Sequence, residues 1–151
     1  MQNKVKKTIA FIGYHQSLAT PLTNMISKGY PVLVTEKQIS EELLLLQQTL
    51  LLTYPSASLD LSICSKESAW ESDILVMSVD VLSLQSICLN IKNVVTGKIM
   101  VTCQDQHYYE KLKVLFPHSK VVWINKNDIF SEHVVAVEKI AALFNEHHYL
   151  T

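Results

Sequence analysis

The chain has 151 residues, a formal net charge of −1 and 48% hydrophobic residues, with only three glycines and four prolines. This length suits one domain with a sizeable core, and the composition excludes a disordered chain. The near-zero charge excludes a general electrostatic attraction to nucleic acid or to a membrane surface, so we expect neither partner. We expect residues 1–151 to form a single domain.

All thirteen basic residues are lysines, so no arginine is present to hold a phosphate with two parallel hydrogen bonds. No apolar run reaches the roughly 18 residues that a membrane span needs. The polar start of the chain does not resemble a signal peptide. Three cysteines, Cys64, Cys88 and Cys103, have no C-x-x-C spacing, and we expect reduced, buried thiols in a cytoplasmic protein.

The first predicted unit extends from Thr8 to Glu36. An apolar run at 8–13 predicts a strand that ends at Gly13, and residues 14–28 have the apolar spacing of a helix. Gly29 ends this helix, and residues 30–35 predict a second strand followed by an acid. A strand, a glycine turn, a helix and a second strand form one βαβ unit, the layout of a dinucleotide-binding half of a Rossmann sheet.

The remaining chain alternates the same two patterns. Ser40 is expected to cap a leucine-rich helix that ends before Pro55. Further strands are predicted at 59–64, 73–79, 98–103 and 120–124, and further helices at 65–71, 81–91, 107–116 and 131–148. This alternation predicts an α/β protein: a three-layer, Rossmann-like, doubly wound fold with a mostly parallel sheet of about six strands.

The glycine turn departs from the G-x-G-x-x-G fingerprint, in which the later glycines let the pyrophosphate and the helix approach closely. Gly13 is present, but the second position is His15 and the third is Leu18, which should push the helix away from the strand. His15, Gln16 and Ser17 either donate hydrogen bonds to an anion or form an exposed loop that binds nothing. Both alternatives stay open at this stage.

Pro21 is a second departure. If Ser17 caps the helix, Pro21 falls at the fourth helical position, where it fits poorly. If Thr20 caps it, Pro21 stands at the favoured first position. We expect the second arrangement, or a short irregular turn before the helix.

Four segments resemble one known family. They are Phe11–Gly13 through Lys28–Val32, then Ala69–Asp80, Gly97–Cys103 and Leu115–Val122. In this order they are similar to the N-terminal Rossmann domain of the deazaflavin-dependent NADP oxidoreductases, and of the related 6-phosphogluconate and 3-hydroxyisobutyrate dehydrogenases and pyrroline-5-carboxylate reductase. The resemblance covers about residues 7–125. It implies binding of NAD or NADP and, if the protein is an enzyme, hydride transfer.

The chain also differs from this family. The proline that usually ends the fourth strand is Asp80 here, and the family's C-terminal helical domain has no counterpart in this sequence. Within the resemblance, the cofactor-binding candidates are Gly13, Tyr14, His15, Gln16, Ser17, Glu36, Lys37, Ser78 and Asp80. No catalytic residue is assigned.

Glu36 follows Gly13 by 23 residues. The fingerprint places an acid about 20 residues on, where it binds the ribose 2′-hydroxyl and favours NAD over NADP. Lys37 beside it is the candidate for a 2′-phosphate. The alternative is a solvated pair at a strand end. Asp80 has a similar alternative, as a helix cap.

Other polar residues at the same sheet edge also have structural explanations. Gln104, Asp105 and His107 follow the fifth strand, where a His–Asp pair is a candidate acid/base, but Asp105 as a helix cap is the expected role. Asn125 and Lys126 follow the last strand. His147 and His148 lack a third ligand, so we expect no metal site.

The leucine-rich helix and the last helix carry more apolar surface than one domain covers, which predicts a homodimer. Two functions remain: an NAD(P)-binding protein related to oxidoreductases, or a degenerate Rossmann module that lost nucleotide binding and acts as an interaction or regulatory protein. Binding of another anionic ligand in the same crevice is a third.

Overall fold

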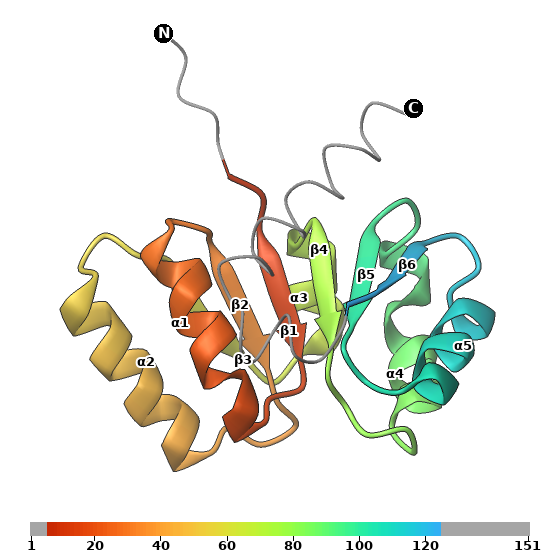
Figure 1. Cartoon of the computed structure of the whole chain (residues 1–151), viewed down its shortest axis with the longest axis horizontal. Helices are drawn as coiled ribbons and strands as arrows, with labels where there is room; N and C mark the ends of the chain where they lie inside the picture. Colours follow the sequence, from red (N-terminus) through yellow and green to blue (C-terminus); the bar gives the residue numbers. More distant parts are fainter. Residues whose placement is uncertain (1–5, 125–151) are drawn as a thin grey trace, which may run out of the picture.

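The computed structural model describes residues 6–124 and contains one parallel sheet of six strands, in the order β3-β2-β1-β4-β5-β6 (Figure 1). The strands are β1 (Ile9–Ile12), β2 (Val32–Thr35), β3 (Leu59–Ser62), β4 (Ile74–Met77), β5 (Ile99–Thr102) and β6 (Lys120–Trp123). Between them lie the helices α1 (Ala19–Ser27), α2 (Glu41–Thr53), α3 (Ser65–Glu71), α4 (Leu84–Ile91) and α5 (Gln106–Leu115), with short 3₁₀ turns η1 (Gln16–Leu18) and η2 (Lys92–Val94). The α/β class and the doubly wound sheet expected from the sequence are confirmed.

The sheet is buried on both faces, which explains the continuous apolar runs of its central strands. Alternate residues of β1 enter different cores: Ile9 and Phe11 pack with α1 and α2, while Ala10 and Ile12 pack with α3, α4 and α5. β3 lies at the sheet edge and is less buried than the central strands: Leu59 is buried, Asp60 is exposed, and Leu61 and Ser62 are half-buried.

The chain order places a topological switch point between β1 and β4. From β1 the chain proceeds outward through β2 and β3, then returns to place β4 on the other side of β1. Because α1 follows β1 on one face and α4 follows β4 on the other, the loops after these strands separate at their carboxyl ends. Ligands of such folds bind in the crevice at this position.

Two predicted helix starts are wrong. The first helix begins at Ala19 rather than Tyr14, after a 3₁₀ turn, and Pro21 is its third residue. The first-turn N–H groups of a helix have no intrahelical partner, so proline is tolerated there. The irregular turn is therefore confirmed, and the Thr20 cap is not. α4 begins at Leu84 rather than at Val81, because residues 81–83 form a separate turn.

Leu18, which was predicted to push the helix away from the strand, is a core residue. It lies in the 3₁₀ turn and is 2% exposed, packed in the core formed by β1, β2, α1 and α2. The position of the third fingerprint glycine is therefore taken by a core residue that packs between the start of α1 and the sheet.

Other expectations are met in part. Ser40 caps α2, since its hydroxyl accepts the Leu43 N–H at 3.2 Å. None of the three cysteines forms a disulfide, but only Cys88 is buried. Cys64 is exposed and Cys103 is half-buried. Within residues 6–124, no helix is long and apolar enough to cross a membrane. The predicted helix at 131–148, Asn125, Lys126, His147 and His148 lie outside the described residues.

Candidate functional site

The candidate residues come together at the carboxyl edge of the sheet, where β1, β2 and β4 end. Ile12 pairs in register with Thr35 on one side and with Met77 on the other. The residues that follow these three are Gly13, Glu36 and Ser78, which the parallel register therefore places side by side. The chain thus brings the glycine turn, the acid after β2 and the end of β4 to one crevice.

Gly13 is required by its backbone conformation and by its neighbours. Its φ is +95°, in the region that L side chains rarely adopt. A Cβ atom there would lie 2.8 Å from the backbone nitrogen of Val79 and 3.0 Å from the carbonyl carbon of Ser78. The turn after β1 therefore packs directly against the end of β4, and only glycine permits this contact.

The turn after Gly13 is closed by its own hydrogen bonds. The N–H of Ser17 donates to Nδ1 of His15 at 3.2 Å, and the same nitrogen lies 2.8 Å from the Ser17 hydroxyl oxygen. The next two N–H groups donate to carbonyls within the turn, Leu18 to His15 at 2.8 Å and Ala19 to Gln16. Three successive donors at the start of the helix, the usual anion-binding position, are thus satisfied internally.

Two carboxylates affect the pKa of Tyr14, the residue after Gly13. Burial raises the pKa of Tyr14, and the negative charges of Glu42 and Glu36 raise it further. Glu42 lies in the first turn of α2, and Glu36 directly follows β2. Both acidic side chains therefore act electrostatically on the residue that follows Gly13.

Glu36 already has a partner inside the protein. Its Oε1 accepts from both the N–H and the hydroxyl of Ser40, each at 3.3 Å. These long bonds tie the end of β2 to the cap of α2. The adjacent Lys37 is exposed. Glu36 is thus positioned at the strand end that the fingerprint requires, and a ligand hydroxyl would share or replace Ser40 as its partner.

The end of β4 contributes one unsatisfied group and one cap. The Ser78 hydroxyl oxygen is buried and is the one such side-chain atom without a hydrogen-bond partner among residues 6–124. Asp80 accepts the N–H of Ser83 at 2.9 Å, so it caps the turn before α4, the alternative that the sequence left open. Buried hydroxyls normally have partners, so the Ser78 oxygen is a candidate ligand contact.

A contact that the sequence did not predict supports the same loop. The Tyr108 hydroxyl, on α5, donates to the Val79 carbonyl at 2.6 Å, and the residue is 4% exposed. Burial, followed by the charges of Asp80 and Cys103, raises the pKa of Tyr108, so it remains a neutral donor. A bond across 29 residues has no signal in local spacing.

Replacing Tyr108 by phenylalanine should cost about 1–2 kcal/mol, because the Val79 carbonyl loses its buried donor. The raised pKa favours the protonated phenol in the folded state. This stabilisation is therefore complete below pH ~10 and is lost as the pH rises toward the folded-state pKa. Urea unfolding of the wild type and Tyr108→Phe between pH 8 and 11 should show a shallower alkaline loss of stability in the variant. Equal slopes would contradict this role of Tyr108.

The predicted acid/base pair after β5 does not form. Asp105 caps α5 by accepting the Tyr108 N–H at 2.9 Å, which confirms its expected role, and His107 is exposed. The Gln104 carbonyl accepts from the Trp123 indole at 2.7 Å. Within the described part of the chain, no group of three or more histidine, cysteine or acidic side chains is arranged to hold a metal.

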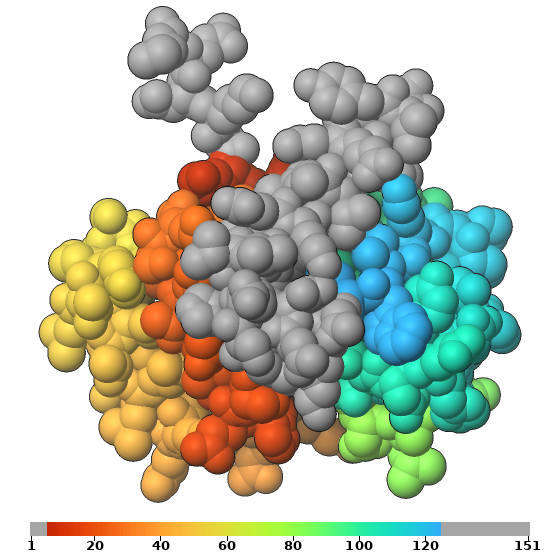
Figure 2. All heavy atoms as spheres, in the orientation of Figure 1, coloured from red at the N-terminus to blue at the C-terminus, as the bar shows by residue number. Residues whose placement is uncertain are grey.

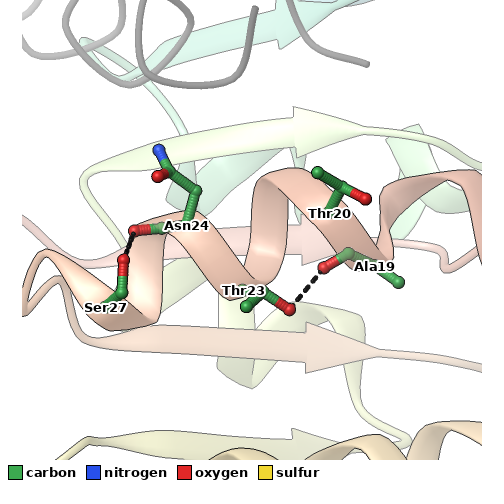
Figure 3. A pocket seen from close by; sticks show the side chains of 5 residues that line it. All are labelled: Ala19, Thr20, Thr23, Asn24 and Ser27. Carbon is green, nitrogen blue, oxygen red and sulfur yellow. Dashed lines mark hydrogen bonds between the residues drawn. The ribbon is translucent and has the colours of Figure 1, made fainter. Parts of the chain in front are cut away.

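A pocket lies away from this crevice, on one face of α1 (Figure 3). It is lined by Ala19, Thr20, Thr23, Asn24 and Ser27. The hydroxyls of Thr23 and Ser27 donate to helix carbonyls, at 2.7 and 2.8 Å, so they hold the helix rather than a ligand. None of the candidate residues lines this pocket.

No protein-family model matches the chain, and no curated protein matches it. Solved structures do match its fold. A putative F420-dependent NADP reductase from Arthrobacter sp. FB24 has a TM-score of 0.62 and 16% identity, over 93% of this chain and 80% of that one. The lactate dehydrogenase of Cryptosporidium parvum, solved with lactic acid and nicotinamide adenine dinucleotide, gives 0.59 and 12%, over 74% of this chain and 42% of that one.

An imine reductase from Myxococcus stipitatus, in complex with NADP⁺, gives a TM-score of 0.56 and 14% identity over 77% of this chain. The chain spans only 39% of that protein. These similarities confirm, at the level of the fold, the resemblance to the N-terminal domains of NADP-dependent reductases. At such low identity they define the fold class, a Rossmann-like α/β domain, and leave the function to the site.

The residues present fit a nicotinamide dinucleotide in part. The Gly13 turn, Glu36 at the end of β2 and the unpartnered Ser78 hydroxyl stand where the two nucleotide halves meet a Rossmann sheet. The N–H donors needed by the phosphates are present, but in this conformation the His15 ring and two carbonyls hold them. Movement of the His15 ring would free one of these three donors, the N–H of Ser17, for a phosphate.

Proposed function

We propose that the chain is a Rossmann-type NAD(P)-binding protein related to oxidoreductases. The observation that supports this most is the sheet order β3-β2-β1-β4-β5-β6 with a positive-φ glycine turn at the switch point. In doubly wound sheets this crevice binds dinucleotides, with the pyrophosphate at the helix start and the first ribose at the end of β2. The solved structures of similar fold include proteins bound to NADP⁺ and to nicotinamide adenine dinucleotide.

Each candidate residue has a specific role in this proposal. Gly13, Tyr14, His15, Gln16 and Ser17 form the phosphate turn, Glu36 accepts a ribose hydroxyl, and Ser78 and Asp80 border the nicotinamide half. Because Glu36 directly follows β2, where the fingerprint places the ribose 2′-oxygen, a 2′-phosphate would meet its negative charge. The adjacent Lys37 is the candidate counter-charge for such a phosphate. We therefore expect a preference for NAD over NADP.

If the chain is catalytic, the reaction is hydride transfer between the nicotinamide and a small substrate. The dinucleotide would supply that chemistry, and the protein would hold and orient the ring. Ser78 and Asp80 are the nearest candidates for that positioning, while no side chain is assigned as an acid or a base.

Calorimetric titration of the full chain with NADH and NADPH separately, at matched salt, tests the proposal. We expect micromolar binding of NADH and weaker binding of NADPH, because Glu36 disfavours the extra phosphate. Matched titrations of Glu36→Gln should narrow the difference between the two ligands. If neither ligand gives heat or a thermal shift up to millimolar concentration, nucleotide binding is excluded and the second candidate function, described next, is favoured.

The second candidate is a degenerate Rossmann module that acts as an interaction or regulatory protein. It is favoured by Leu18, which is 2% exposed in the core where the fingerprint has a glycine, and by the closed hydrogen bonding of residues 15–19. In this case Gly13 and His15 serve the fold alone, and the crevice has no ligand.

We also propose that the chain is a homodimer that associates through α2. This helix lies at the outer edge of the molecule, on the left in Figure 2. It packs next to the edge strand β3. Its outward leucines Leu44, Leu45 and Leu52 are 41%, 62% and 83% exposed. Residues 43–53 contain no charge, and the charged residues of α2 are confined to its first turn, at Glu41 and Glu42.

Sedimentation velocity at micromolar concentration tests the dimer. The wild type should sediment as a dimer, and the double variant Leu45→Lys/Leu52→Lys as a monomer, because two buried lysines would be unpaired. Val114→Lys, on α5 and 78% exposed, is the matched control and should remain dimeric. A monomeric wild type would remove this proposal.

We further propose that residues 1–151 form one domain and that it works in the cytoplasm. Three free cysteines, one of them exposed, suit a reducing compartment. The six-stranded sheet, with a core on each face, supports a single folding unit.

A further inference from the structure

The side chain of His15 accepts a backbone N–H in the turn after β1. Its Nδ1 accepts the N–H of Ser17 and also lies within hydrogen-bond distance of the Ser17 hydroxyl. In the G-x-G-x-x-G turn this second position is a glycine so that the pyrophosphate can approach the backbone. Here the imidazole nitrogen accepts a hydrogen bond from a backbone N–H of the same turn, as a phosphate oxygen would.

The backbone at His15 does not require this ring. Its φ of −137° and ψ of 150° are extended values that any residue adopts. His15 is also exposed, and Leu18 rather than His15 supplies the buried anchor of the turn. The ring can therefore rotate away, or be removed, without changing the path of the chain.

A second observation points to a ligand at the same crevice. The buried hydroxyl oxygen of Ser78 has no partner within residues 6–124. Ser78 directly follows β4, and its carbonyl carbon would be 3.0 Å from a Cβ at Gly13, so this strand end abuts the glycine turn. A buried hydroxyl without a partner is unfavourable, and a bound ligand that reaches it would relieve that penalty.

We propose that His15 is an internal competitor for the phosphates of the ligand, which keeps the turn closed until a phosphate displaces its ring. This inference rests on the proposed function, because it concerns the same crevice. His15 is a specificity-determining residue here: it lowers the affinity for every ligand that binds through a phosphate at Ser17. On binding, the Ser17 N–H exchanges the His15 ring for a phosphate oxygen as its acceptor. The net free energy of binding gained from that hydrogen bond is therefore small.

Two substitutions of His15 separate the effect of its side-chain hydrogen bond from the other effects of replacing the residue. His15→Ala removes the competing acceptor and frees the Ser17 N–H. His15→Asn is the matched control, because an asparagine oxygen can accept the N–H two residues on and keep the turn closed. Circular dichroism should show the melting temperature of the wild type for His15→Asn and a small decrease for His15→Ala, because alanine removes the side chain that caps the Ser17 N–H.

The test measures dissociation constants of the full chain for two probes, NADH and inorganic pyrophosphate, by calorimetry and by the amide signal of Ser17 in NMR spectra. His15→Ala should bind both probes about five- to tenfold more tightly than the wild type, the value of one net hydrogen bond. His15→Asn should remain within about twofold of the wild type.

The two probes distinguish the failure of this inference from that of the proposed function. If no variant binds NADH but His15→Ala binds pyrophosphate more tightly, the nucleotide function fails and the competitor role stands. If NADH binds equally to wild type and His15→Ala, the function stands and the competitor role is overturned. Equal gains in His15→Ala and His15→Asn, or no pyrophosphate binding by any variant, would also overturn it.

Discussion

Gly13→Ala should destabilise the fold by about 3–4 kcal/mol, the largest effect that we expect from a single methyl group in this chain. Two penalties combine at this position. The φ of +95° is strained for any residue with a side chain, and the added Cβ would lie 2.8 Å from the Val79 backbone nitrogen. Backbone atoms of two neighbouring strand ends cannot yield as the tip of a flexible side chain does.

Gly97→Ala is the matched control for this prediction. Gly97 has a φ of +81°, but a Cβ there would have no atom within 4 Å. Only the conformational penalty then applies, which is about 1–2 kcal/mol. Urea unfolding followed by circular dichroism measures both variants. Equal losses would mean that the close approach of β4 to the glycine turn contributes nothing.

Leu84→Ala should destabilise the protein by about 3 kcal/mol. Leu84 is the first residue of α4, is 0% exposed and packs in the core with Met77 and Leu112. Its truncation removes buried apolar surface and leaves a cavity beside β4. Because β4 ends at the crevice, the same change should also weaken binding of NADH.

Leu89→Ala, on the same helix, is the control. Leu89 is 69% exposed, so its truncation should change the free energy of unfolding by no more than about 0.5 kcal/mol. Leucine and alanine have similar helix propensities, so the difference between the two variants reports burial alone. A Leu89→Ala loss as large as that of Leu84→Ala would contradict the assignment of the inner face of α4.

The class of fold could be predicted from the sequence because the central strands are continuous apolar runs. Residues 74–77 and 99–102 are buried on both faces, and a parallel sheet is the structure that requires this pattern. The positions of the caps Ser40 and Asp105 also followed from the sequence, since each is a good acceptor directly before a helix.

The starts of α1 and α4 could not be predicted from periodicity. Both helices follow short polar turns, around His15 and Asp80, in which a side chain accepts a backbone N–H. Their signal is local hydrogen bonding rather than apolar spacing. The burial of Leu18 was likewise not evident from periodicity, because it lies in the 3₁₀ turn before the helix.

The candidate site could also be predicted only in part. Its location followed from the order of strands, because parallel strands share one carboxyl edge. The state of the site did not, because the His15–Ser17 contact, the partner of Glu36 and the unpartnered Ser78 oxygen depend on side-chain geometry. A histidine in place of the second glycine, followed two residues later by a serine, was the signal available.

The central claim is that the crevice formed by the ends of β1, β2 and β4 binds a nicotinamide dinucleotide. Titration of the isotopically labelled full chain with NADH, followed residue by residue in amide NMR spectra, tests it most directly. We predict that the largest shifts occur at residues 13–17, Glu36 and Ser78, and that they saturate together at micromolar ligand. No shifts at these residues, or shifts confined to the α1 pocket, would contradict the claim.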